Sequence, residues 1–229
     1  MNPYGSYRAL LSNAVAAMSA AIEIYNKPNF TYREECFTIL QVNAWELVLK
    51  ALLSKNRRRI YYKKVRGQPY RTLSVSDALT RSEKLFPSAV AFKPTAENLR
   101  LLIGYRDSAV HFYNRPGFEA LIYALAQTSI VNFRDLVSAA FDRDISKEIT
   151  VSLLPLSFAP PVDPVEFLKE KASSTGSDAV SEYSRTIREL VVQLESEGED
   201  TARLLTTFSV ALVSTKKVSA ADLVVGVTS

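Results

Sequence analysis

The pattern of hydrophobic and polar residues predicts four long amphipathic helices in the first 141 residues. Apolar residues recur every three or four positions, which is the spacing that buries one face of a helix. The predicted helices cover about residues 6–26, 31–52, 95–111 and 118–141. The last of them is apolar on nearly every side, so we expect it to lie deep in the protein or in a dimer interface. Four such helices joined by mostly short connections predict a four-helix bundle.

Local sequence signals predict where these helices begin and end. Pro28 should end the first helix, and Thr31 with Glu34 three residues later is a capping-box arrangement that should begin the second. A short helix is expected over residues 77–86. Asn114 lies in a segment with Pro and Gly that is typical of a helix end, so the third helix should stop there.

The sequence changes character after residue 141, which predicts a second, smaller α+β region over residues 142–229. Residues 149–156 and 204–227 are strand-like, and a proline-rich connection at 160–164 precedes helical patterns at about 165–172 and 178–197. The predicted domains are therefore a helical domain, 1–141, and this C-terminal region. Because an apolar run continues to the last residues, we also expect the chain to be a piece of a longer protein.

The composition is that of a globular protein, with 229 residues, of which 47% are hydrophobic and 23% charged. Cys36 is the only cysteine, so an intrachain disulfide and a zinc site built from cysteines are excluded. Its place in an apolar pattern predicts a buried thiol. The first residues lack the pattern of a signal peptide, and no apolar run has the length of a membrane span, so we expect a cytoplasmic protein that does not contact membranes.

The charge is unevenly distributed, with 19 Lys and Arg against 10 Asp and Glu in residues 1–141, and 9 against 14 in the remainder. No acidic residue occurs between Glu46 and Asp77, and β-forming residues flank a turn at Gly67. This pattern predicts a basic insertion at residues 57–76, as a β-hairpin or a flexible loop. The candidate RNA-binding residues in it are Arg57, Arg58, Arg59, Tyr61, Tyr62, Lys63, Lys64, Arg66 and Arg71.

Two interpretations of this basic insertion are open. Lysine and arginine bind phosphates, and tyrosine stacks on unpaired bases, so aromatic residues within a basic run favour nucleic-acid binding. The alternative is a solvated protrusion whose charges keep an edge strand soluble.

His111 is the only histidine, so any histidine chemistry must take place there. It follows Arg106 by five residues and Asp107 by four. Five helical steps turn the chain by about 140°, so Arg106 and His111 do not share a helix face, whereas Asp107 and His111 lie one turn apart. Taken alone, a histidine near a helix C-terminus is more often structural, because its positive charge interacts favourably with the helix dipole.

Arg106 and His111 together match the R-x4-H signature of the HEPN superfamily (higher eukaryotes and prokaryotes nucleotide-binding). Segments 24–30, 32–35, 42–47 and 50–51 also resemble an uncharacterised bacterial family that is grouped with HEPN proteins. The resemblance covers roughly residues 7–140. It implies a dimer of four-helix bundles, and in many members a metal-independent endoribonuclease of a toxin–antitoxin, CRISPR or anti-phage system. Other members only bind partners, so the resemblance leaves the activity open.

The expected site lies between two protomers whose third helices meet across a two-fold axis. His111 would exchange a proton with the RNA 2′-hydroxyl or the leaving 5′-oxygen, and Arg106 would bind the scissile phosphate and stabilise its charge. Asp107 would orient the imidazole, or would act only as a helix-stabilising partner at i,i+4. Neither a metal ion nor a cofactor is expected.

Five further residues are candidates for supporting roles. Asn43, Glu46 and Lys50 form a polar stripe on the second helix, where Glu46 and Lys50 are either a simple surface pair or a support for the cleft. Tyr113 and Asn114 either contact RNA or cap the helix, and capping is the better explanation for Asn114.

Three functional hypotheses therefore compete. A dimeric ribonuclease needs His111, and a catalytically inactive nucleic-acid-binding module needs only the basic insertion. A protein-interaction or sensor subunit needs neither, and would use its acidic C-terminal region. The expected partners are RNA, a second copy of the chain, and an antitoxin or another protein of a defence system.

Overall fold

The computed structural model of the chain describes residues 4–27, 30–108, 118–146 and 179–206. These residues are mainly helical, as the sequence predicts, and they contain no strand beyond one isolated antiparallel bridge between Tyr61 and Thr72. In chain order the elements are α1 (Tyr7–Asn26), α2 (Arg33–Lys55), α3 (Val75–Ser82), η1 (Glu83–Leu85), α4 (Phe92–Ser108), α5 (Phe118–Phe141), α7 (Ala179–Ser196) and η2 (Thr201–Arg203).

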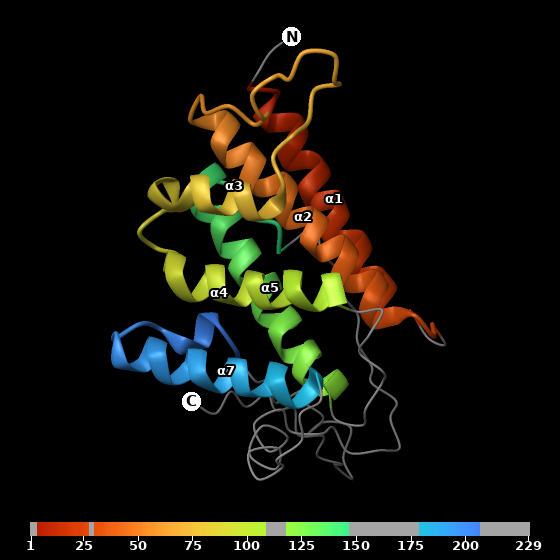
Figure 1. Cartoon of the computed structure of the whole chain (residues 1–229), viewed down its shortest axis with the longest axis vertical. Helices are drawn as coiled ribbons and strands as arrows, with labels where there is room; N and C mark the ends of the chain where they lie inside the picture. The colour runs from red at the N-terminus through yellow and green to blue at the C-terminus, as the bar shows by residue number, and fades with distance from the viewer. Residues whose placement is uncertain (1–3, 28–29, 109–117, 147–178, 207–229) are drawn as a thin grey trace, which may run out of the picture.

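Helices α1 and α2 lie side by side along the long axis of the molecule (Figure 1). Ser6 caps α1, because its hydroxyl accepts a hydrogen bond from the Ala9 amide. The predicted capping box of α2 is wrong. Tyr32 occupies the N-cap position of α2 without a side-chain hydrogen bond, and the carboxylates of the first turn, Glu34 and Glu35, instead provide the negative charge that a helix N-terminus favours.

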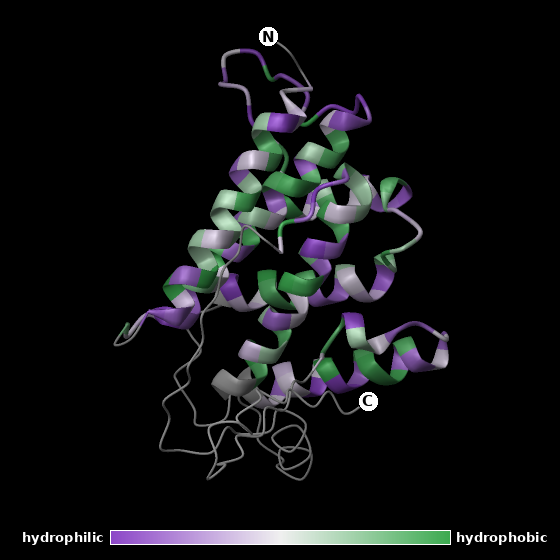
Figure 2. Cartoon of the chain, turned by 180° about the vertical axis from the view of Figure 1, so that it is seen from behind, coloured by the Kyte–Doolittle hydropathy of each residue, from purple (hydrophilic) through white to green (hydrophobic). Residues whose placement is uncertain are grey.

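The core forms where α2 packs against α5. The Trp45 side chain is fully buried, donates a hydrogen bond from Nε1 to the Ser129 hydroxyl at 2.7 Å, and meets the Phe133 ring edge-on at 5.7 Å. Gln41 donates from Nε2 to the Ala126 carbonyl at 2.8 Å. Helix α5 is thus central, as its apolar pattern predicts. Figure 2 shows hydrophobic and hydrophilic positions alternating along the helices, as amphipathic packing requires.

Helix α2 is also long and apolar enough to cross a membrane, judged by length and composition alone. However, 67% of its most apolar window is buried inside the protein. Its position in the core accounts for its apolar composition.

Helix α4 lies across α2 and α5, and α7 lies beside it (Figure 1). It begins at Phe92, before the predicted start, because Pro94 fits the first turn of a helix, where the backbone amides have no helical acceptor. Asn98 donates from Nδ2 to the carbonyls of Leu125 at 3.0 Å and Leu204 at 2.8 Å. These bonds connect α4 to α5 and to the segment after η2.

The C-terminal described segment, residues 179–206, packs on α4 and α5. The Tyr183 hydroxyl of α7 donates to the Leu101 carbonyl at 2.8 Å, and burial raises the pKa of Tyr183 far above its usual value, with a smaller contribution from Tyr105. Arg203 donates from Nη1 to the Asp135 carboxylate at 3.1 Å, and its own carbonyl accepts from Asn132 at 2.8 Å. The helix predicted near 178–197 is therefore present as α7.

Two further predictions need correction. Cys36 is half-buried instead of buried. The short helix begins at Val75 instead of at residue 77, because the Ser74 hydroxyl caps it by accepting from the Asp77 amide at 3.2 Å. The predicted elements at 149–156 and 165–172 lie outside the described residues, and so does all of the predicted strand at 204–227 except residues 204–206, which are not in a strand. The division at residue 141 and the HEPN-like bundle stay predictions.

Candidate functional site

Arg106 and Asp107 lie at the C-terminal end of α4 and form an ion pair. The Arg106 guanidinium donates to Asp107 Oδ1 from Nε at 2.9 Å and from Nη2 at 2.8 Å. The Arg106 side chain is 30% exposed, so its remaining N–H groups can still reach an anion from solvent. The second carboxylate oxygen of Asp107 accepts no hydrogen bond from any described residue, and the side chain is 59% exposed. Among the described residues, this oxygen is therefore free to accept a hydrogen bond.

The other residues of the predicted motif, His111, Tyr113 and Asn114, lie outside the described residues. Arg106 and Asp107 are therefore the part of the motif whose geometry is established. Within the described ranges, no group of three His, Cys, Asp or Glu side chains is arranged to hold a metal ion.

One face of α4 near Arg106 is exposed and has a glycine at its centre. Arg100, Gly104 and Asp107 follow one another at spacings of four and three residues, so they lie on the same face, and all three are exposed. A Cβ atom added to Gly104 would meet no atom within 4 Å. Among the described residues, nothing outside the turns of α4 itself therefore requires glycine at this position. The backbone of α4 is open here to a close approach from outside.

The polar stripe predicted on α2 is not uniform. Asn43 is exposed, Glu46 is half-buried and Lys50 is 4% exposed. Lys50 Nζ lies 2.5 Å from Glu46 Oε1 and also donates to the Thr72 hydroxyl at 3.0 Å. The Glu46–Lys50 pair is thus connected to the base of the basic insertion. It is more than the simple surface pair considered from the sequence.

Residues 57–71, called here the basic loop, leave α2 through a tight C-terminal turn. Arg57 has a positive φ of 53° and donates from its amide to the Ser54 carbonyl at 3.0 Å, while the Arg58 amide donates to the Leu53 carbonyl at 2.8 Å. This pair of bonds is the Schellman arrangement, in which glycine usually occupies the position taken here by Arg57. The turn places Arg58 and Arg59 at the start of the loop.

The basic loop is closed by a single isolated antiparallel bridge between Tyr61 and Thr72, without the two strands of the predicted hairpin. The Tyr62 amide donates to the Arg71 carbonyl at 3.0 Å, and the Leu73 amide donates to the Ile60 carbonyl at 2.9 Å. Gly67, with φ of 79°, lies in the turn at the loop tip. All residues from 63 to 72 are exposed. Figure 2 shows mostly hydrophilic positions along this loop.

The tyrosines of the basic loop differ in their roles. Tyr61 and Tyr62 are half-buried, and the Tyr62 hydroxyl donates to the Asp77 carboxylate and accepts from the Ser74 amide at 3.1 Å. The hydrogen bond from Tyr62 is the main reason that the pKa of Asp77 is lowered. Tyr70 is 51% exposed, and Lys64 Nζ lies 4.3 Å from the centre of its ring. Tyr62 therefore anchors the loop, whereas Tyr70, absent from the predicted set, is the ring accessible to a base.

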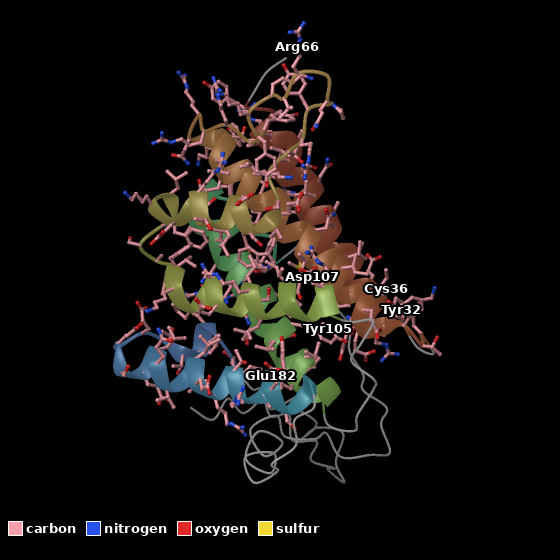
Figure 3. The ribbon with its side chains drawn as sticks, viewed as in Figure 1. Tyr32, Cys36, Arg66, Tyr105, Asp107 and Glu182 are labelled. Atoms are coloured by element: carbon pink, nitrogen blue, oxygen red, sulfur yellow. The ribbon has the colours of Figure 1, made fainter. Side chains whose placement is uncertain are left out.

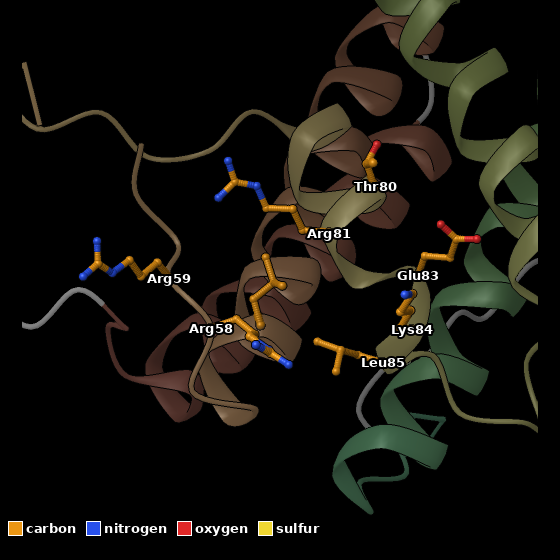
Figure 4. Close-up of a pocket in the computed structure, with 8 residues that line it drawn as sticks. Arg58, Arg59, Thr80, Arg81, Glu83, Lys84 and Leu85 are labelled. Atoms are coloured by element: carbon orange, nitrogen blue, oxygen red, sulfur yellow. The ribbon is translucent and has the colours of Figure 1, made fainter. Parts of the chain in front are cut away.

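A pocket of about 390 Å³ lies beneath the start of the basic loop (Figure 4). Arg58 and Arg59 line one side, and Arg81 of α3 and Lys84 of η1 line another. Arg81 and Lys84 are not among the residues predicted from the sequence, because neither belongs to the acid-free run. Only the packing of α3 against α2 brings them to the two loop arginines.

The basic loop and the Arg106 site are separate within one protomer. Figure 3 shows Arg66 at the end of the molecule near the N-terminus, and Asp107 near the middle, at the end of α4. In the same figure Tyr105 lies between α4 and α7. The expected arrangement, with basic surface flanking a cleft that contains Arg106, therefore depends on a second protomer.

The family model of DUF3644, a domain of unknown function, matches residues 9–191. No curated protein and no solved structure matches the chain. The family match agrees with the resemblance to an uncharacterised family, and it continues past residue 141 into α7. Since it covers most of the 229 residues, the chain belongs to the DUF3644 family of domains of unknown function.

Proposed function

We propose that the protein is a metal-independent endoribonuclease of the HEPN type that acts as a homodimer. The main support is the position of Arg106, which presents a partly exposed guanidinium at the end of α4. The sequence adds His111 five residues later, and a guanidinium with an imidazole is sufficient for phosphodiester cleavage by the 2′-hydroxyl of RNA.

In the proposed reaction Arg106 binds the scissile phosphate and stabilises the charge that grows on it. His111 removes the proton of the 2′-hydroxyl or donates one to the leaving 5′-oxygen. The new bond joins the 2′-oxygen to phosphorus and the bond to the 5′-oxygen breaks, which leaves a 2′,3′-cyclic phosphate and a 5′-hydroxyl. Asp107 keeps one carboxylate oxygen unoccupied within the described residues, and this oxygen is suited to orient an imidazole.

The exposed face of α4 supports the dimeric form of the proposal. Gly104 lets a second helix approach the α4 backbone closely, and Asp107 lies one turn further along the same face. Two copies related by a two-fold axis would bring both Arg106 side chains to one cleft. In this proposal the protein acts in a toxin–antitoxin or anti-phage defence system, where an antitoxin or another partner protein controls it.

The substitutions His111→Ala and Arg106→Ala test the proposal, with Arg185→Ala as the control, because Arg185 is an exposed arginine of α7 outside the proposed site. We expect either test variant to lose about 10²–10⁴-fold in the rate of RNA cleavage, and the control to keep its rate. Cleavage should persist in EDTA and should spare DNA, because DNA has no 2′-hydroxyl. A folded His111→Ala variant that cuts RNA at the wild-type rate would exclude this mechanism, as would cleavage of DNA.

A catalytically inactive RNA-binding module is the second candidate, and the exposed cations of the basic loop favour it. In this case Lys63→Gln with Lys64→Gln should weaken RNA binding and reduce its salt dependence, because fewer counterions are released. The slope of log K against log salt should fall by about 0.7 for each lost phosphate contact. Fluorescence anisotropy over a salt series measures it, and an unchanged slope would exclude RNA contact by these lysines.

A further inference from the structure

The pocket beneath the basic loop combines four cations with an apolar floor. Arg58, Arg59, Arg81 and Lys84 line it together with the buried Leu53. They come from two parts of the chain, the turn after α2 and the α3–η1 segment, whose positions are fixed by the packing of α2 against α3. The cations therefore surround a defined recess and are not spread over a flat surface.

No side chain among these four forms an ion pair with a described residue. Asp77 is close enough to Arg81 for the positive charge to lower its pKa, but no ion pair joins them, and the Tyr62 hydroxyl is the larger cause of that shift. Glu83 is the only carboxylate on the pocket lining. Figure 4 shows it directed away from the side toward which Arg59 and Arg81 extend. The pocket thus has a large excess of positive charge.

We propose that this pocket binds a phosphomonoester, either the terminal phosphate of an RNA strand or the phosphate of a free nucleotide. An arginine side chain can bind two oxygens of one phosphate group at the same time. Several cations around one recess compensate the charge of a doubly charged group better than a single cation does. A phosphomonoester carries between about −1.5 and −2 at pH 7. An internal phosphodiester of RNA carries only a single charge. The charge of the pocket therefore favours an end over the middle of a strand.

The position of the pocket favours the end of RNA over the free nucleotide. Arg58 and Arg59 begin the basic loop, so a strand whose terminal phosphate occupies the pocket can continue along the exposed cations of that loop. The volume of about 390 Å³ falls in the range of pockets that hold a small molecule, so a nucleotide also fits. This site is separate from Arg106, and its occupation does not depend on RNA cleavage.

The test measures binding of short single-stranded RNA to the full chain by fluorescence anisotropy. The RNA carries 2′-O-methyl groups, which prevent attack by the 2′-oxygen, and has a phosphate at the 5′ end, at the 3′ end or at neither. We expect wild-type protein to bind one phosphorylated form at least about tenfold more tightly than the unphosphorylated form, the gain typical of charge-assisted hydrogen bonds. Competition with adenosine monophosphate and with inorganic phosphate tests the second source.

Arg81→Gln with Lys84→Gln is the pocket variant, and Lys63→Gln with Arg66→Gln is the control with the same loss of charge on the loop. The pocket variant should lose the preference for the phosphorylated end, while the control should weaken binding of all forms equally. Arg59→Gln with Lys84→Gln provides a second pocket variant, and circular dichroism checks that each protein is folded.

The outcomes separate the two sources of phosphate. If adenosine monophosphate competes with phosphorylated RNA at a similar affinity, and the pocket variant no longer shows this competition, the ligand is a free nucleotide. Preference for phosphorylated RNA without such competition identifies the strand end. Equal binding of all RNA forms together with no competition overturns the proposal, and so does a preference that both pocket variants retain. None of these readouts requires cleavage, so failure of the proposed ribonuclease activity would be recognised separately.

Discussion

The ammonium group of Lys50 is buried against the carboxylate of Glu46, one helical turn earlier on α2, at a distance of 2.5 Å. Its second contact is the Thr72 hydroxyl at 3.0 Å, at the end of the basic loop. Only 5% of the Lys50 side chain is exposed, compared with 30% of Glu46. A buried lysine of α2 therefore connects this helix to the base of the basic loop.

We expect Lys50→Met to lower the free energy of unfolding by about 1–3 kcal/mol, because it removes two hydrogen bonds of a charged donor. The loss stays below that of a fully buried pair, since Glu46 keeps some contact with water. Urea unfolding followed by the fluorescence of Trp45, the only tryptophan, measures the change. Asn43→Ala, an exposed change on the same helix, should shift stability by no more than about 0.5 kcal/mol. Equal midpoints for the two variants would contradict this role of Lys50.

Arg57→Gly should stabilise the protein by about 1 kcal/mol. Arg57 has a φ of 53°, a left-handed conformation that is strained for a residue with a Cβ atom and unstrained for glycine. Thermal unfolding measures the gain. Arg59→Gly is the control, because Arg59 is also exposed but has no positive φ, and it should bring no gain. If both glycine variants melt at or below the wild-type temperature, the turn after α2 is not strained.

Gly104→Ala should raise stability by about 0.5–1 kcal/mol, because alanine favours a helix interior and the added Cβ meets no other described part of the chain within 4 Å. Gly104→Trp, by contrast, should weaken the proposed dimer, since the large side chain would keep a second helix away from α4. Sedimentation velocity and the rate of RNA cleavage measure this effect. A Gly104→Trp protein that dimerises as tightly as wild type would show that this face of α4 is not the interface.

The hydrogen bond from Tyr62 to Asp77 makes a pH-dependent contribution to stability. It holds the pKa of the Asp77 carboxyl below its ordinary value of 3.8, so the stabilisation is fully present above pH 3.8 and is lost as the pH falls through the lowered pKa. Tyr62→Phe should therefore reduce stability more at pH 6 than at acid pH, where Asp77 is protonated and the loss of the bond from the Ser74 amide remains. Urea unfolding of both proteins across this pH range tests the sign. A difference that grows toward low pH would be inconsistent with the bond.

The helices could be predicted from the sequence because their signals are local. The apolar spacing in α1 and α5, and the serine that caps α1, act within a few residues of the backbone they influence. The start of α2 was predicted wrongly for a related reason. Thr31 with Glu34 fits the spacing of a capping box, but α2 begins after Tyr32 without a side-chain cap, and local spacing does not reveal this.

Some features of the candidate site could likewise be predicted from the sequence, and others could not. The adjacency of Arg106 and Asp107 follows from their order in the chain, and the concentration of positive charge in the basic loop is visible in the sequence. The partners of Lys50 and Tyr62, and the meeting of Arg58 with Arg81, were decided only by the tertiary structure. Helical periodicity determines which face of α2 is apolar, but not which segment covers it, because long-range packing depends on the complementary shapes of the whole set of helices.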